Sequence, residues 1–317
     1  MRGVSVVGYG KVPYGALEGK TLRDLCAEAG ITCMKNTGIE PEEIEAFYLG
    51  NFVASRLVDQ NHVAPFAASA VGLKHIPCTR TEAACSSGAL ALIEGIFSIL
   101  AGMYKVVMVM GVEKMTSRDT PTVTEALAGA ADAELEAYAG ITFPSAFALM
   151  ARRHMHEFGT KREHLSSVAV KNHWFGARNP YAHMRKEVTL DKAMNSRMIC
   201  SPLNLYDCSL ISDGAAALIL ADKSDVHRSR VRNPNTVAFD IHDRVNYAAK
   251  DSRITVANPE TIELSILIDP DISSVMEYFE IFLDRMIISR RACNCLLYTS
   301  DAADEGLGVD LGGRRII

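Results

Sequence analysis

Residues 79–88 read Thr-Arg-Thr-Glu-Ala-Ala-Cys-Ser-Ser-Gly, and the rest of the chain is organised around this stretch. It places one cysteine, Cys85, between an extended run and a helix that we predict over 86–100. Only Glu94 and Ser98 interrupt the apolar residues of that helix, so we expect it to be buried on all sides. Small residues recur along it at helical spacing and predict a narrow seam for a close neighbour such as another helix: Gly88, Ala91 and Gly95.

The position of Cys85 is typical of a nucleophile. The thiolate is the reactive form of cysteine, and the positive end of a helix stabilises a thiolate or an oxyanion. A strand, then a cysteine, then small residues that open a helix would hold the sulfur on a tight turn. Free cysteine is also among the most buried residue types, so these residues alone leave a structural cysteine equally open.

Composition narrows the class of protein. The chain has 317 residues, 48% hydrophobic and 22% charged, which is typical of a globular protein of about two domains. A net charge of −5 gives no reason to expect nucleic acid or a membrane surface as a partner. The eight cysteines lack regular spacing, which favours reduced thiols in a cytoplasm. Residues 1–10 do not resemble a signal peptide, and no apolar run is long enough to span a membrane.

The order of predicted elements is typical of an α/β fold. We expect strands at 4–8, 46–49, 105–112 and 211–221, and helices at 22–36, 61–71 and 86–100. Strands that alternate with helices favour a sheet with helices on both faces. Between 117 and 201 no long apolar strand occurs, so we expect an inserted excursion there.

The segment 82–90, Glu-Ala-Ala-Cys-Ser-Ser-Gly-Ala-Leu, resembles the nucleophile motif of the thiolase family. It is most similar to the branch with archaeal acetyl-CoA acetyltransferases and sterol-carrier-protein-type thiolases. Other matching stretches follow in order: Val6-Val7-Gly8-Tyr9-Gly10-Lys11, Lys171-Asn172-His173, Asn179-Pro180, Ser201-Pro202-Leu203 and Ser212-Asp213-Gly214-Ala215-Ala216-Ala217. The resemblance covers residues 1 to about 232. Several ordered motifs are a specific signal, whereas each alone is weak.

The resemblance implies acyl transfer between CoA thioesters. Cys85 would form an acyl-enzyme with an acyl-CoA, and its backbone N–H would donate to an oxyanion. A second acetyl-CoA would then condense with the acyl group, and the reverse reaction would cleave a 3-ketoacyl-CoA. By position, Phe143 would line the pantetheine tunnel. No metal or redox cofactor is needed, and family members associate as homodimers or tetramers through the strand that corresponds to 77–83.

The resemblance also implies how the chain is divided. Residues 1–117 would form the first part of an N-terminal thiolase-like domain, a mixed sheet with helices on both faces. Residues 118–200 would be the loop domain that covers the CoA site, and 201–232 the last strand region of the first domain. A second thiolase half-domain is not recognisable, and we interpret 233–317 as an aberrant tail, frame-shifted or artefactual.

The family's C-terminal catalytic histidine, in a Gly-His-Pro turn, and its second cysteine have no counterpart in this sequence. His242 comes too soon after Asp213-Gly214 to replace the histidine, and we interpret it as an exposed loop residue. Glu82 lies near Cys85, but a carboxylate beside the thiolate would raise the pKa of the thiol. We therefore expect little turnover from this chain.

Other histidines and cysteines are interpreted as structural. Cys26 and Cys33 fall on the apolar side of a helix and belong to the core. Cys200 and Cys208 are packed thiols, and Cys293-x-Cys295 is too weak a pattern for a metal site. His154 and His156 point in different directions on a helix and are exposed, while His173 is a hydrogen-bonded structural histidine.

Three alternatives stay open. A related condensing enzyme, of the ketoacyl synthase or hydroxymethylglutaryl-CoA synthase kind, shares the fold and the cysteine. A non-catalytic acyl-CoA-binding or scaffold subunit would bind CoA without acylation of Cys85. A non-functional gene product would be poorly soluble, because an exposed half-core aggregates.

Overall fold

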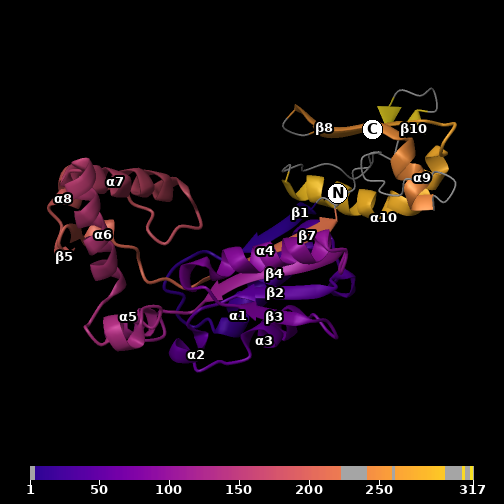
Figure 1. Cartoon of the computed structure of the whole chain (residues 1–317). Helices are drawn as coiled ribbons and strands as arrows, with labels where there is room; N and C mark the ends of the chain where they lie inside the picture. The colour runs from indigo at the N-terminus through magenta and orange to yellow at the C-terminus, as the bar shows by residue number, and fades with distance from the viewer. Residues whose placement is uncertain (1–3, 223–240, 259–260, 297–308, 311–314, 317) are drawn as a thin grey trace.

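The computed structural model describes residues 4–222, 241–258, 261–296, 309–310 and 315–316. A five-stranded sheet with the order β1-β7-β4-β2-β3 forms the centre of its N-terminal part (Figure 1). The strands are β1 (Val4–Lys11), β2 (Ala46–Gly50), β3 (Cys78–Thr81), β4 (Val106–Glu113) and β7 (Gly214–Asp222). β2 is parallel to β3 and β4, whereas β7 is antiparallel to β1 and β4. The expected α/β fold with a mixed sheet is confirmed.

One face of the sheet is covered by α1 (Leu22–Thr37) and α3 (Val63–Val71). α1 begins at a capping box, in which Thr21 Oγ1 accepts from the Asp24 N–H and the Asp24 carboxylate accepts from the Thr21 N–H. Gly38 ends the helix in the left-handed conformation, with φ of 62°. These signals were readable in the sequence, and the helix lies where we predicted it.

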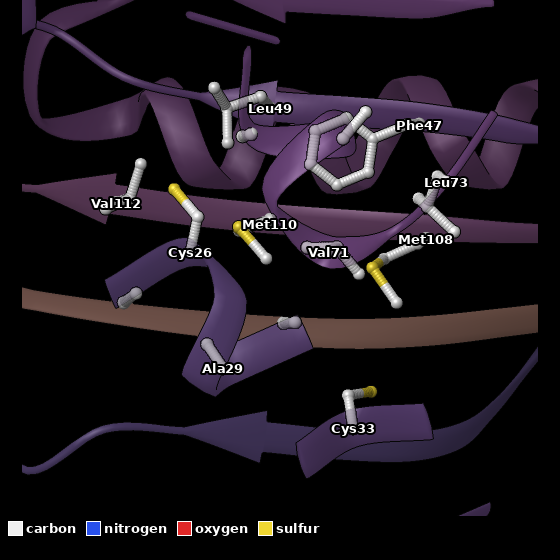
Figure 2. Packing of buried hydrophobic residues seen from close by; sticks show 14 of the residues in the cluster. Cys26, Ala29, Cys33, Phe47, Leu49, Val71, Leu73, Met108, Met110 and Val112 are labelled. Carbon is white, nitrogen blue, oxygen red and sulfur yellow. The ribbon is translucent and has the colours of Figure 1, made fainter. Parts of the chain in front are cut away.

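The core of the molecule lies between these helices and the sheet (Figure 2). Phe47 from β2 and Met108 from β4 are fully buried there. Cys26 and Cys33 from α1 point into the same cluster and are fully buried, which confirms their interpretation as core residues. Burial raises the pKa of the Cys26 thiol to about 12, so this sulfur is an inert packing group.

The other face carries α4 (Ser87–Leu100), the helix that follows Cys85. The expectation that this helix is buried on all sides is wrong. Its inner side packs on β4 and β7, but Phe97 is 63% exposed, and two further apolar side chains face outward: Ile93 and Leu100. The small-residue seam faces the sheet at two of its three positions: Ala91 is fully buried, and a Cβ added to Gly95 would lie 2.7 Å from Val109 Cγ2, whereas a Cβ added to Gly88 would meet open space.

Between β4 and β7 the chain makes a long excursion, which lies to one side of the sheet in Figure 1. Its helices are α5 (Thr120–Ala128), α6 (Phe143–Phe158), α7 (Arg162–Arg178) and α8 (Leu190–Met194), with a short π-helical turn at Ala133–Ala137. A small hairpin, β5 (Met198–Cys200) with β6 (Leu203–Asn204), precedes the return to the sheet. A short helix on the sheet side, α2 (Ala54–Leu57), packs against α5.

Residues 241–258 and 261–296 form a helix, a pair of antiparallel strands and a second helix. These are α9 (Ile241–Ala248), β8 (Ala249–Asn258), β9 (Thr261–Ile268) and α10 (Val275–Leu296). Tyr278 and Phe282 form the buried side of α10, whereas Met276 is 73% exposed. α10 contacts β1 and α1 of the sheet layer. Two short strands, β10 (Val309–Asp310) and β11 (Arg315–Ile316), pair with each other.

None of the helices in the described ranges combines the length and the apolar character needed to cross a membrane.

Candidate active site

The carboxyl ends of the parallel strands β2, β3 and β4 lie at one edge of the sheet. Gly50 pairs with Thr81 and Gly111, and Glu113 pairs with Gly214, the first residue of β7. In open α/β sheets, ligands bind outside this edge. Cys85 follows β3 there, so the structure brings the predicted nucleophile to the edge where a site is expected.

Cys85 sits in a single 3-10 turn, Ala84–Ser86, directly before α4. It is exposed, whereas the other five cysteines whose side chains the structure describes are buried or partly buried. The first turn of a helix presents N–H groups that lack partners within the helix and carries partial positive charge. The sulfur is therefore accessible beside a surface that stabilises an anion.

The backbone of this turn is strained and held by short hydrogen bonds. Ala84 has φ of +47°, a left-handed conformation that residues with a Cβ rarely adopt. Its N–H donates to Glu82 Oε1 at 2.6 Å, and its carbonyl accepts from Ser87 Oγ at 2.7 Å. Ser87 Oγ also accepts from the Ala83 N–H at 3.0 Å. Glu82 thus serves the turn itself as a hydrogen-bond acceptor.

The start of α4 is pressed against the end of β2. A Cβ added to Gly50 would lie 2.5 Å from the backbone of Ser87 and Gly88, closer than real contacts allow. Thr81 Oγ1 donates to the Ser87 carbonyl at 2.9 Å from the neighbouring strand. The glycine at position 50 lets the helix begin directly on the sheet, and this contact fixes the place of Cys85.

The segment after β2 is tied to the ends of β3 and β4. Asn51 Nδ2 donates to the Val112 carbonyl at 2.8 Å, and Arg80 Nε donates to the Asn51 carbonyl at 3.1 Å. Glu113 accepts the Phe52 N–H at 2.5 Å. Burial raises the pKa of Glu113 despite this hydrogen bond. None of these polar residues stood out in the sequence, and the signal that they share is their position directly at strand ends.

A buried ion pair lies at the same edge, two strands away from β3. Lys114 Nζ contacts Asp213 Oδ2 at 2.5 Å, and both side chains are almost fully buried. Burial would raise the pKa of Asp213, but hydrogen bonds from Lys114 and Thr116 outweigh it and lower that pKa. In the sequence, Asp213 was named only as part of a stretch that resembles the family. The pairing with Lys114 was missed, because nothing in the sequence links positions so far apart.

A second contact that the sequence did not reveal joins the excursion to the segment just before β7. His183 Nδ1 and Ser212 Oγ are hydrogen-bonded at 2.7 Å, and both residues are half-buried. Ser212 belongs to a motif on which the resemblance rests, but His183 carried no signal that we recognised.

The other histidines singled out in the sequence lie on helices α6, α7 and α9. His154 and His156 are exposed on α6, as predicted. His173 is hydrogen-bonded to the Lys186 carbonyl at 3.0 Å and packs edge-on against Tyr206, which confirms its structural role. His242 lies in the first turn of α9 and not in a loop, and its side chain falls outside the described residues.

The structure also locates the other residues for which the sequence suggested a role. Phe143 begins α6, is half-buried and stacks on Phe147, with 6.4 Å between ring centroids; its role in a pantetheine tunnel stays a prediction. Cys200 and Cys208 are partly buried, as expected of packed thiols. The side chains of Cys293 and Cys295 fall outside the described residues. Over the ranges that the structure describes, no cluster of three histidine, cysteine or acidic side chains could hold a metal ion.

Comparison with known proteins gives a consistent result. The family model described as "Thiolase, N-terminal domain" matches residues 4–224. An acetyl-CoA acetyltransferase of Methanothermobacter thermautotrophicus is 42% identical over 81% of this chain and 68% of its own length, so this match continues beyond Arg232. An acetyl-CoA acetyltransferase of Methanocaldococcus jannaschii is 43% identical over 70% of this chain. This chain spans only 56% of that relative's length.

Among solved structures, human mitochondrial 3-ketoacyl-CoA thiolase in complex with CoA superimposes with a TM-score of 0.56. The superposition covers 70% of this chain and 65% of the human chain, at 19% identity. At that identity the likeness concerns the fold alone. The family resemblance expected from the motifs around Cys85 is confirmed by the sequence comparisons.

Proposed function

Because the chain belongs to the thiolase family, we propose that Cys85 accepts an acyl group from an acyl-CoA and passes it to a second CoA thioester. The observation that carries this proposal is the exposed sulfur of Cys85 on a strained turn at the start of α4. Because two archaeal relatives are named acetyl-CoA acetyltransferases, acetyl-CoA is the first substrate to test.

In the first step the Cys85 thiolate attacks the carbonyl carbon of the acyl-CoA. The bond between that carbon and the CoA sulfur breaks, and CoA leaves as a thiol after it takes a proton. In the second step the deprotonated methyl carbon of acetyl-CoA attacks the thioester, and Cys85 leaves as a thiolate with a 3-ketoacyl-CoA as the product. N–H groups at the start of α4, including that of Cys85, would stabilise the oxyanions.

The two steps make different demands on the chain. Acylation needs an accessible thiol and oxyanion donors, and the exposed turn at the start of α4 offers both. Condensation also needs a base for the methyl proton, and the Gly-His-Pro turn that carries it in the family does not occur in this sequence. We therefore expect acylation of Cys85 to be readily measurable and complete turnover to be slow.

Intact-protein mass spectrometry after incubation with acetyl-CoA tests the acylation step. We expect one acetyl group on the full chain, none on Cys85→Ala, and the wild-type result on the matched control Cys78→Ala. Cys78 lies on the adjacent strand β3, and burial raises the pKa of its thiol, so it should not compete. An unmodified wild-type chain, or acetylation that persists in Cys85→Ala, would refute the proposal.

The outermost strand of the sheet, β3, supports self-association. Among the described strands, β3 pairs with β2 alone, so its other side offers backbone N–H and C=O groups to a further strand. We propose that residues 77–83 of two copies pair there to form a homodimer. Sedimentation of the full chain is expected to show a dimer or a multiple of it, and a monomer at micromolar concentration would contradict this part of the proposal.

A further inference from the structure

The excursion is closed at its base by two residues far apart in sequence. Lys114 is the first residue after β4, and Asp213 is the last residue before β7. The chain therefore leaves the sheet at the lysine and returns to it at the aspartate. Their side chains meet at 2.5 Å, with 7% and 0% of their surfaces exposed. We call this pair, together with Thr116, the clasp.

The carboxylate of Asp213 is saturated by donors from both sides of the gap. Its Oδ1 accepts the Met115 and Thr116 N–H groups, each at 2.8 Å. Its Oδ2 accepts from Lys114 Nζ, from Thr116 Oγ1 at 2.6 Å and from the Leu17 N–H at 3.0 Å. Three chain segments converge on one carboxylate: the loop after β1, the exit from β4 and the entry to β7.

Lys114 is equally committed. Besides the carboxylate, its ammonium group donates to the Leu17 carbonyl at 3.2 Å and to Thr116 Oγ1 at 3.3 Å. A buried charge left without its partner is strongly destabilising, whereas a neutral pair of similar shape can be tolerated. The packing of these two side chains is therefore stable only when both charges are present or when both have been removed.

The excursion has further attachments to the sheet layer. An apolar cluster joins α5 to α2 through Val53, Leu57, Val123 and Ala126. The Tyr14 N–H donates to the Tyr181 carbonyl at 2.9 Å, close to the contact between His183 and Ser212. Farther out, α7 packs on α8, and α6 on β5. A small rotation at the base would therefore displace the outer helices by a larger distance.

We infer that the clasp sets the position of the excursion relative to the edge that carries Cys85, and thereby controls how well an acyl-CoA binds there. This inference rests on the proposed function of Cys85. Lys114 and Asp213 act here as positioning residues, since neither is a neighbour of Cys85 in the sheet order. Their loss should affect the binding of a large thioester and leave the chemistry of the exposed thiol unchanged.

The test uses two reagents of different size on the full chain. Asp213→Asn keeps the shape of the side chain but leaves the Lys114 charge unpaired. We expect the acetyl-CoA concentration for half-maximal acetylation of Cys85 to rise about tenfold or more, because a displaced excursion loses binding contacts to the thioester and about 1.4 kcal/mol of binding free energy is a factor of ten. The limiting acetylation rate and the rate of alkylation by iodoacetamide should stay close to wild type.

Two further variants separate a clasp from general damage. The double variant Lys114→Met with Asp213→Asn removes both charges and should recover most of the lost affinity. The matched control is Glu187→Gln, which removes a carboxylate of the same excursion from a half-exposed ion pair with Arg178 at 2.8 Å. This control should behave like the wild type in both assays.

Three outcomes would overturn the inference: no rise in the half-saturating concentration, an equal loss in the single and double variants, or a parallel loss of alkylation. If Asp213→Asn does not fold, Thr116→Val removes the two hydrogen bonds of the Thr116 hydroxyl within the clasp and must show the same split. If the wild-type chain is not acetylated, the proposed function fails. In that case hydrogen exchange tests whether the clasp positions the excursion. Faster exchange at 115–129 in Asp213→Asn, with unchanged exchange in β2, would support the inference.

Discussion

The two faces of the sheet are built differently, and Cys26 and Cys85 mark the difference. The face under α1 and α3 is a closed core in which Cys26 is fully buried with a raised pKa. The face under α4 has a smaller cluster, and the outer side of that helix is apolar and exposed. Stability resides on the first face, and the accessible thiol belongs to the second. The same side chain is therefore inert or available according to the layer that carries it.

The largest expected effect compares one substitution on the two faces. Phe47→Ala empties a fully buried site under α1, and we expect it to lower the free energy of unfolding by about 3–5 kcal/mol. Phe97→Ala, on the exposed side of α4, should change it by less than about 0.5 kcal/mol. Urea unfolding of both variants measures the contrast. A large loss in Phe97→Ala would break the comparison, because it would mean that α4 is covered in solution.

A smaller effect is expected where α4 meets the sheet. Gly50→Ala places a methyl group against the backbone of Ser87 and Gly88, and overpacking of this kind lowers stability by about 1–3 kcal/mol. Since this contact positions the turn before the helix, acetylation of Cys85 should also slow.

The matched control is Gly111→Ala on the adjacent strand. There the nearest atom to an added Cβ, outside the chain neighbours, is 4.0 Å away. This variant should keep near wild-type stability and acetylation. Equal behaviour of the two alanine variants in thermal unfolding would show that the approach of α4 to β2 is not a constraint on Cys85.

Much of the fold could be predicted because local signals are strong. The Thr21 cap, the left-handed Gly38 and the apolar run that became β4 each specify structure within a few residues. The prediction for α4 was wrong for a physical reason. An almost wholly apolar helix is compatible with burial on every side, but only tertiary contacts decide which of its sides is covered, and here the sheet covers one.

The candidate site was predictable only in part. Cys85 was found because its neighbours in sequence form the motif, and its turn is local. Lys114 and Asp213 are 99 positions apart, and His183 and Ser212 are 29 apart, so no periodic pattern or spacing connects them. Such contacts depend on strand order, which places the exit from β4 beside the entry to β7. Sequence reasoning that stops at single elements cannot supply that order.

The left-handed alanine before Cys85 has a mechanical meaning. A residue with a Cβ is held at this φ at a cost of about 1 kcal/mol, and a glycine would avoid that cost but would move among many backbone conformations. With Ala84 anchored at both its N–H and its carbonyl, the backbone has few other geometries to visit. The sulfur is thus held by a rigid backbone turn, and its orientation toward an incoming carbonyl is set before that molecule binds.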